Sequence, residues 1–103
     1  MNSIYIDTRD NKQIIIKVEK DGQVLEEKSE ANVNRAQAAL PIIERLLKQA
    51  DLKIEEIDEV KVETGPGSFT GLRVGVSIAN ALAFGLNVKV NGKPLGEIEM
   101  PQY

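Results

Sequence analysis

The stretch that decides the fold is residues 58–75, DEVKVETGPGSFTGLRVG. Its opening residues alternate polar and apolar side chains, which predicts a strand over 58–63. A glycine-rich loop follows, and it carries Ser68, a residue type that caps helix N-termini. Apolar residues then continue, which predicts a helix over 69–86. A strand that passes through a glycine-rich loop directly into a helix is the central unit of an α/β domain.

Upstream of this unit, the sequence predicts three strands and a helix. Runs rich in β-branched residues predict strands over 3–7 and 13–19, and a third strand follows over 24–28. Asp21-Gly22 between the last two is a strong hairpin signal. From about Asn34 to Ala50, apolar residues recur at helical spacing. Pro41 lies inside that helix and is expected to bend or interrupt it, because proline lacks a backbone donor.

Downstream, residues 87–90 lead into a turn at Asn91-Gly92, and the pattern predicts a final strand over 96–99. Residues 51–57 form a charged connection that includes one short helical turn. The predicted order is therefore βββαβαβ. Strands joined by short turns pair antiparallel, and strands separated by a helix usually pair in parallel. The sequence thus predicts an α/β fold with a mixed sheet.

The composition of the chain excludes several classes of function. The chain has 103 residues, 42% of them apolar and 28% charged, as in a single globular domain. It contains no cysteine and no histidine, which excludes disulfides and Ser-His-Asp or Cys-His catalysis. A net charge of −3 offers no basic surface for nucleic acid. The N-terminus lacks the pattern of a signal peptide and no apolar run reaches membrane-spanning length, so a cytoplasmic protein without membrane contact is expected.

The predicted helix over 69–86 is apolar nearly all round. Small residues recur every four positions along it, at Gly71, Gly75, Ala79 and Ala83. Such a stripe lets another backbone approach closely, and each interior glycine costs roughly 1 kcal/mol relative to alanine, which close packing would offset. Two interpretations remain open: the stripe accommodates an element of the same domain, or it forms a helical interface with a partner.

The glycine-rich loop also has two interpretations. Backbone donors at a helix start favour anions, so Gly65, Gly67, Ser68 and Thr70 are candidates for a phosphate or nucleotide site. The loop lacks the lysine of a Walker loop, and it does not match GxGxxG because the third glycine comes one place late. The other interpretation is a tight turn that needs glycine for its backbone angles and for close approach to the helix.

Taken as a string, GPGSFTGLRVG over 65–75 is more specific than its parts, and it resembles the hallmark segment of the TsaB (YeaZ) family. Further segments are similar to that family over about residues 3–90. They are Ile6-Asp7-Thr8, Gly22 to Glu27, Leu40 to Leu47 and Ala79 to Asn87.

This resemblance implies a fold and a role. TsaB proteins have the actin/Hsp70-like fold, in which each lobe is an RNase H-like unit. The family is regarded as catalytically inert and supports the related enzyme TsaD in forming threonylcarbamoyladenosine in tRNA, with the ATPase TsaE as a further component. The contact with TsaD is helical, and TsaB also self-associates through the same surface. No cofactor is implied. TsaD carries a histidine metal motif, and this chain has no histidine.

The chain departs from the family pattern in three places. Family members are roughly twice as long, so residues 1–103 are expected to be one N-terminal lobe with no second lobe. Arg35-Ala36-Gln37-Ala38 stands where the family often has His-Ser-Glu. Arg9 stands where a serine is usual. Asp7 and Glu63 end two predicted strands and give at most an acidic pair, too few ligands for the two-metal site of a nuclease.

The leading hypothesis is a non-catalytic partner of a TsaD-like subunit that binds through its two helices. The alternatives are a phosphate- or nucleotide-binding protein that uses residues 65–71, and a homodimer formed through the helices. The residues predicted for the helical interface are Ala36, Ala39, Leu40, Ile43, Leu47, Leu72, Arg73, Val76, Ala79, Asn80 and Ala83.

Overall fold

The computed structural model describes residues 1–10, 12–30 and 35–102, apart from the side chains of Arg35 and Ala36. The predicted helix start at Asn34 and the predicted interface contact of Ala36 therefore lie outside the described residues. The elements in chain order are β1 (Asn2–Asp7), β2 (Gln13–Lys20), β3 (Gln23–Glu30), α1 (Arg35–Gln49), the 3-10 turn η1 (Ile54–Glu56), β4 (Glu59–Val62), α2 (Phe69–Leu86) and β5 (Lys89–Val90). This order confirms the one predicted from the sequence.

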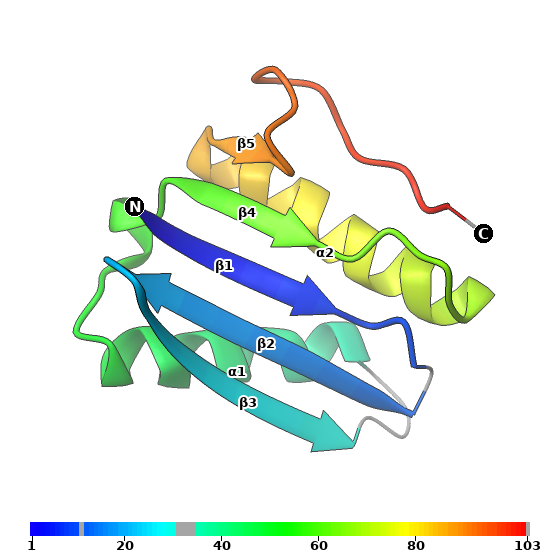
Figure 1. Cartoon of the computed structure of the whole chain (residues 1–103), viewed down its shortest axis with the longest axis horizontal. Coiled ribbons are helices and arrows are strands. Elements are labelled where there is room, and N and C mark those ends of the chain that lie inside the picture. Colours follow the sequence, from blue (N-terminus) through cyan, green and yellow to red (C-terminus); the bar gives the residue numbers. More distant parts are fainter. Residues whose placement is uncertain (11, 31–34, 103) are drawn as a thin grey trace.

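The strands form one mixed five-stranded sheet in the order β3-β2-β1-β4-β5 (Figure 1). The pairs β1–β2 and β2–β3 are antiparallel. The pairs β1–β4 and β4–β5 are parallel, because a helix carries the chain back before each of these strands begins. The predicted α/β class with a mixed sheet is thus confirmed.

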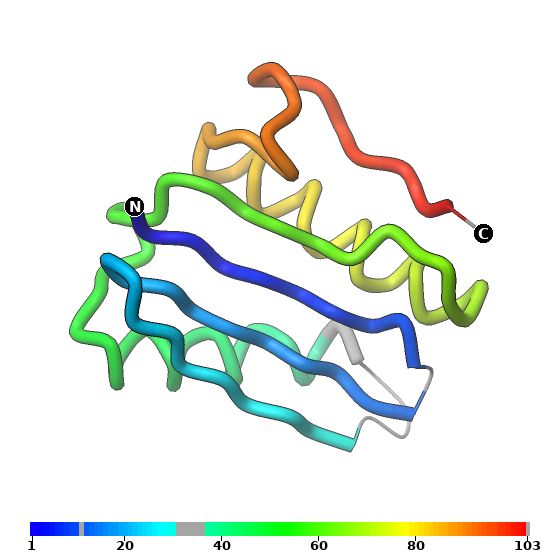
Figure 2. The backbone as a smooth tube through the Cα atoms, in the orientation of Figure 1, coloured from blue at the N-terminus to red at the C-terminus, as the bar shows by residue number. Residues whose placement is uncertain are grey.

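The core lies on one face of the sheet, where α1 and α2 run side by side (Figure 2). Ile4 of β1 is flanked by Val18 of β2 and Val60 of β4, and all three are fully buried. Successive strand residues point to opposite faces, so one apolar set per strand is enough to meet the helices. This two-layer arrangement explains the alternation of buried and partly exposed residues along β2 and β4.

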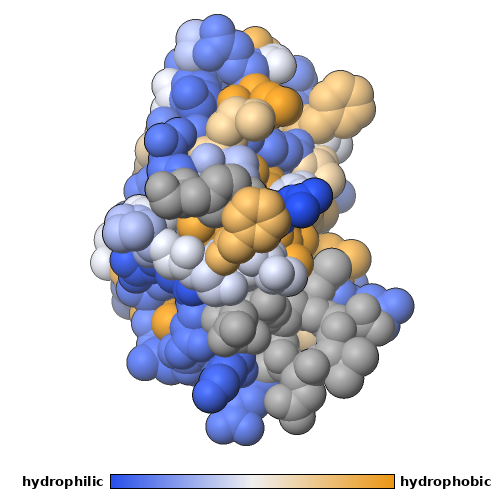
Figure 3. All heavy atoms as spheres, turned by 90° about the vertical axis from the view of Figure 1, so that its right-hand side faces the viewer, coloured by the Kyte–Doolittle hydropathy of each residue, from blue (hydrophilic) through white to orange (hydrophobic). Residues whose placement is uncertain are grey.

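The other side of the sheet, called here the open sheet face, carries charged and polar side chains. Lys17 of β2 pairs with Glu26 of β3 at 3.5 Å and lies over the ring of Tyr5, 5.0 Å from its centroid. Figure 3 views the molecule from the end where β1 and β4 finish. Hydrophilic residues dominate the side that belongs to the open sheet face, and hydrophobic residues lie on the side of the helices. The residues described on this face therefore suit contact with water.

The turn chemistry agrees with the sequence. Asp21 and Gly22 have φ of 49° and 89°, the left-handed conformation that a two-residue hairpin requires. Asn91 and Gly92 have φ of 50° and 72° at the predicted turn. Ser68 is the N-cap of α2, and its side chain accepts a hydrogen bond from the backbone of Gly71. These predictions are confirmed.

Pro41 does not interrupt α1. The helix runs from Arg35 to Gln49 with Pro41 inside it. Proline removes the hydrogen bond from its own nitrogen and crowds the carbonyl four residues earlier, but Pro41 lies on the exposed side of the helix, where that carbonyl can tilt outward. A carbonyl on that side can be solvated by water. The expected interruption is therefore wrong.

The predicted final strand over 96–99 is also absent from the described residues, and β5 ends at Val90. Residues 93–102, called here the strap, instead pass through a turn at 94–97 and then return along the sheet edge beside α2 (orange to red in Figure 1). The backbone of Glu99 pairs with the side-chain amide of Asn80. A side chain of α2 thus takes the place that a neighbouring strand would occupy.

Candidate functional site

The glycine-rich loop is packed against two other segments of the chain. A Cβ on Gly65 would lie 2.0 Å from the backbone oxygen of Gln102 in the strap. A Cβ on Gly67 would lie 2.9 Å from the Cβ of Arg9, and the N–H of Ser68 donates to the carbonyl of Arg9 at 2.8 Å. Both glycines are therefore required by close approach of the backbone.

This geometry bears on the predicted phosphate site. The backbone donor of Ser68 bonds to Arg9, and the Ser68 hydroxyl caps the helix. The chain itself covers Gly65, whereas Gly67 and Thr70 are exposed. The packing interpretation accounts for every contact of the loop described here. No contact in the described structure calls for an anion, and the phosphate site remains a prediction from the sequence.

The small-residue stripe of α2 faces the sheet. Thr8, which follows β1 and is fully buried, donates its hydroxyl to the carbonyl of Gly71 at 2.5 Å. A Cβ on Gly75 would lie 2.2 Å from that hydroxyl oxygen. Gly71, Gly75, Ala79 and Ala83 are all buried. Of the two interpretations of the stripe, internal packing is the one that the structure supports.

Most of the predicted interface residues belong to the core. Both helices use their apolar stripes against the same face of the sheet, because a single sheet offers them one shared core. As a result, seven predicted interface side chains are at most 6% exposed, and assigning them to an outer contact surface was wrong. They are Ala39, Ile43, Leu47, Leu72, Val76, Ala79 and Ala83. Of the rest with described side chains, Leu40 is 51% exposed, Arg73 is exposed and Asn80 holds the strap.

The side of the helices that faces away from the sheet is called here the outer helix surface. It contains a shallow hollow of about 360 Å³ on α2, lined by Thr70, Arg73, Val74, Ser77 and Ile78. Beside it, Phe69 is 58% exposed and lies under the guanidinium of Arg73, 5.4 Å from its ring centroid. On α1, Leu40 is the large apolar side chain of this surface.

Sequence reasoning missed most of this surface, although it named Leu40, Arg73 and, for the loop, Thr70. Because α2 is apolar nearly all round, hydropathy does not mark which side is outermost. One signal was available: Phe69, Arg73 and Ser77 recur every four residues on the side that carries the polar groups of the helix. By length and composition α2 does reach the range of a membrane span, so the expectation that no apolar run is long enough was wrong. This is weak evidence for a membrane, because α2 packs on the sheet.

Polar residues meet where β1 and β4 end. Arg9 forms a two-pronged contact with Asp7, with Nε 3.1 Å from Oδ1 and Nη2 2.9 Å from Oδ2. A further nitrogen of Arg9 is 3.8 Å from Glu63, and Tyr5 donates its hydroxyl to Glu63 at 2.6 Å. The guanidinium therefore lies between the two carboxylates that the sequence placed together.

These contacts determine the charge states. Burial favours the neutral form of Asp7, but the hydrogen bonds and charge of Arg9 outweigh it, so the pKa of Asp7 lies below its usual value. Burial and the Glu63 hydrogen bond raise the pKa of Tyr5, which stays neutral and donates. Among residues 1–10, 12–30 and 35–102, no three His, Cys, Asp or Glu side chains lie close enough to hold a metal ion. Asp7 and Arg9 thus form a charged, hydrogen-bonded pair at the end of β1.

Arg9→Met is expected to raise the pKa of Asp7 and to lower the free energy of unfolding at pH 7 by about 1 kcal/mol, a modest effect because the guanidinium is partly exposed. Since the folded-state pKa of Asp7 is depressed, its contribution is present above the unfolded pKa of about 3.9 and is lost as the pH falls through the folded value. Urea unfolding at pH 7 and pH 3 measures this. Lys53→Met is the control for loss of charge, and an equal pH dependence in both variants would contradict the assignment.

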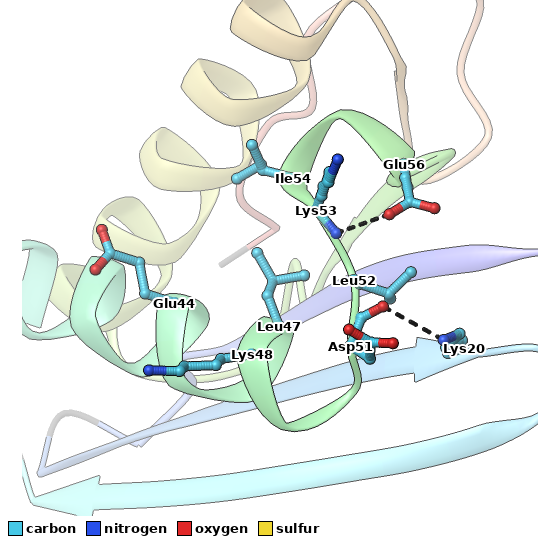
Figure 4. Close-up of a pocket in the computed structure, with 9 residues that line it drawn as sticks. All are labelled: Lys20, Glu44, Leu47, Lys48, Asp51, Leu52, Lys53, Ile54 and Glu56. Carbon is cyan, nitrogen blue, oxygen red and sulfur yellow. Dashed lines mark hydrogen bonds between the residues drawn. The ribbon is translucent and has the colours of Figure 1, made fainter.

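A hollow of about 800 Å³ lies at the C-terminal end of α1 (Figure 4). Lys20 closes one side and donates to the carbonyls of Ala50 and Asp51 at 3.1 and 3.4 Å. Lys53 donates its backbone N–H to the side chain of Glu56. Cations suit the carbonyl end of a helix, so Lys20 stabilises α1. The lining mixes acids and bases, and it selects no charged ligand class.

The chain is similar to known proteins over most of its length. The model of the family described as "TsaD: tRNA N6-adenosine threonylcarbamoyltransferase" matches residues 15–92. The chain is 30% identical, over 88% of its length and 40% of the relative's, to the tRNA threonylcarbamoyladenosine biosynthesis protein TsaB of Bacillus subtilis.

Solved structures are also similar to the chain over most of its length. YeaZ from Pseudomonas aeruginosa superposes with a TM-score of 0.78 at 27% identity, over 86% of this chain and 41% of that one. A Bacteroides thetaiotaomicron protein with an actin-like ATPase fold superposes with a TM-score of 0.53 at 19% identity, over 86% and 31% of the two chains, which shows the fold alone. The chain spans about two fifths of the length of TsaB and YeaZ.

Proposed function

The chain belongs to the family of TsaB (YeaZ) and TsaD proteins, and from this premise we propose that it is a non-catalytic, TsaB-like partner of a TsaD-like threonylcarbamoyltransferase. In this role it supports the formation of threonylcarbamoyladenosine in tRNA. The observation that carries the proposal is the outer helix surface, which combines exposed apolar side chains with an arginine on a helix layer that the fold leaves uncovered.

The outer helix surface has the composition of a contact surface. Phe69 and Leu40 are more than half exposed, and Arg73 lies over the Phe69 ring. Aromatic residues and arginine are enriched where proteins meet, whereas lysine and glutamate are depleted there. The hollow beside Arg73 offers a place for a side chain of the partner. A second, helix-rich surface would fit this layer by ordinary helix packing.

The polar groups at the ends of β1 and β4 support a non-catalytic role. A catalytic carboxylate must reach substrate or metal, but Asp7 is occupied by Arg9, and Glu63 accepts from Tyr5. The sequence also lacks histidine, the commonest general base. Chemistry is accordingly assigned to the partner, and this chain supplies a binding surface. A TsaE-like ATPase is proposed as a further component of the same assembly.

Binding to the TsaD-like subunit of the same organism tests the proposal. Leu40→Glu and Arg73→Glu are each expected to weaken binding at least tenfold, about 1.4 kcal/mol, because each places an acidic group in the contact. Isothermal titration calorimetry measures the affinity. The matched controls are Val24→Glu and Lys28→Glu on edge strand β3, where Val24 is 55% exposed and the Lys28 side chain 60%.

The outcomes separate two errors. A wild-type chain that does not bind the TsaD-like subunit contradicts the proposed function. Binding that Leu40→Glu and Arg73→Glu leave unchanged, or that the β3 variants weaken equally, contradicts the assigned surface while the function stands.

A further inference from the structure

A hollow of about 320 Å³ lies at the C-terminal end of α2, between the helix and the strap. The most deeply buried residues that line it are Ala83 and Val90. Its other apolar lining is open to water: Phe84 is 89% exposed, and Leu95 and Ile98 are each more than half exposed. Large apolar side chains that stay exposed around one hollow mark an interaction site.

Hydrogen bonds hold the part of the strap that lines this hollow. The N–H of Glu97 donates to the carbonyl of Pro94 at 3.0 Å, and Gly96 between them has a φ of 92°, as a tight turn requires. This turn follows β5 at the edge of the sheet (Figure 1). Two residues further on, the backbone of Glu99 is bonded in both directions to the side-chain amide of Asn80. The hollow is therefore preformed, which lowers the entropic cost of filling it.

The rim of the hollow is electronegative. Of the described residues that line it, Glu97 alone is charged, and the ion pairs found among the described residues do not include it. Lys93, four residues earlier, lies 3.7 Å from Glu99 instead. The carbonyl end of α2 carries a partial negative charge at the same place, and no basic residue in its last turn balances that charge. A cation is therefore favoured at this rim.

Phe84 adds a second attraction for a cation. The face of an aromatic ring is negative and attracts a guanidinium or ammonium group placed over it. The same helix has this pairing at its other end, where the guanidinium of Arg73 lies 5.4 Å from the ring centroid of Phe69. Arginine suits such a place better than lysine, because its guanidinium is planar and more weakly hydrated. Its aliphatic stem also packs along apolar side chains while the charged head stays in water.

We propose that this hollow binds an arginine side chain presented by a basic segment of a protein partner. The stem of the arginine lies against Leu95 and Ile98, and its guanidinium lies between the Phe84 ring and the Glu97 carboxylate. A volume of about 320 Å³ is at the lower end for small-molecule sites and suits one long side chain. The hollow is at the opposite end of α2 from Phe69, so it is separate from the contact proposed for the TsaD-like subunit.

Three capped tripeptides test this chemistry on the full chain. They carry arginine, leucine or glutamate between two glycines, and NMR titration of the backbone amide signals measures their binding. The arginine peptide is expected to bind at millimolar concentration and at least threefold more tightly than the leucine peptide, because only arginine adds the charge contacts. The glutamate peptide is expected not to bind. The shifted signals are expected to be those of Phe84, Asn87 and Glu97.

Variants assign the two contacts separately. Glu97→Gln removes the charge and keeps the shape, so it is expected to lower the affinity for the arginine peptide at least threefold and to leave that for the leucine peptide unchanged. Phe84→Ala is expected to weaken both peptides. The matched controls are Glu55→Gln, at an exposed acid of η1, and Val24→Ala on β3. The NMR spectra also show whether each variant is folded.

Several results would overturn the proposal. The arginine peptide could fail to bind, or bind no better than the leucine peptide, which would make the hollow a general apolar contact. Glu55→Gln could weaken the arginine peptide as much as Glu97→Gln does, which would reduce the effect to net charge. Shifts of the same signals on dilution without any peptide would mean that a second copy of the chain occupies the hollow.

Discussion

Gly75→Val is expected to lower the free energy of unfolding by about 3 kcal/mol, since overpacking a tight core forces side chains and backbone apart. The added Cβ would lie 2.2 Å from the Thr8 hydroxyl oxygen, which is buried and bonded to Gly71. Thr8 cannot swing away without breaking that bond, and α2 cannot rise without opening the core. The strain therefore falls on the contact between α2 and the end of β1.

Gly85→Ala is the matched control for this substitution. Gly85 lies in the same helix, and a Cβ there would meet no atom within 4 Å. Alanine is the better helix former, so this variant is expected to be about 0.5 kcal/mol more stable than the wild type. Chemical unfolding followed by circular dichroism measures both. If Gly75→Val were as stable as the wild type, the stripe would not face the sheet. The other interpretation, in which the stripe forms a helical interface with a partner, would then be favoured.

Ile16→Ala is expected to cost about 3 kcal/mol, and Ile15→Ala less than about 1 kcal/mol, although the two residues are neighbours of the same type. Ile16 lies on the helix side of β2 and is fully buried. Ile15 points to the open sheet face and is only partly covered. Removing its side chain leaves no cavity, because water already reaches that position.

This pair tests whether a further layer covers the open sheet face in solution. Unfolding in urea gives both free energies, and the slope of the transition checks that the unfolded state is unchanged. An equal, large cost at Ile15 would mean that the face is covered by another body. The ion pair of Lys17 with Glu26 on this face suits exposure to water, as does the cation above Tyr5.

Elements with a clear local signal could be predicted from the sequence. Asp21-Gly22 specified its hairpin through left-handed backbone angles, and Ser68 specified the start of α2. The alternation in β4 and the helical spacing in α1 gave the correct element types. The strand predicted over 96–99 was wrong. A short run with strand-like composition has the same sequence pattern whether its backbone pairs with a strand or, as at Glu99, with the side chain of Asn80.

The candidate site could be predicted only in part. Arg73 and Leu40 are exposed as a contact surface requires, but Ile43, Val76 and Ala79 are in the core. Helical periodicity identifies an apolar stripe and does not say whether the stripe meets the sheet of its own domain or a partner. In a small domain with two helices on one sheet face, the apolar stripes of both helices are buried in the core.

By itself the sequence determined the order of the elements, the mixed sheet and the family, because period, turn residues and a specific loop are local properties. The tertiary structure alone decided the rotation of α2 about its axis. Hydropathy has little contrast around that helix, so its orientation follows from Gly75 fitting against Thr8. It also decided the course of the strap, where an inward glutamate and outward apolar residues reverse the usual pattern because Asn80 and Asn91 satisfy the buried polar groups.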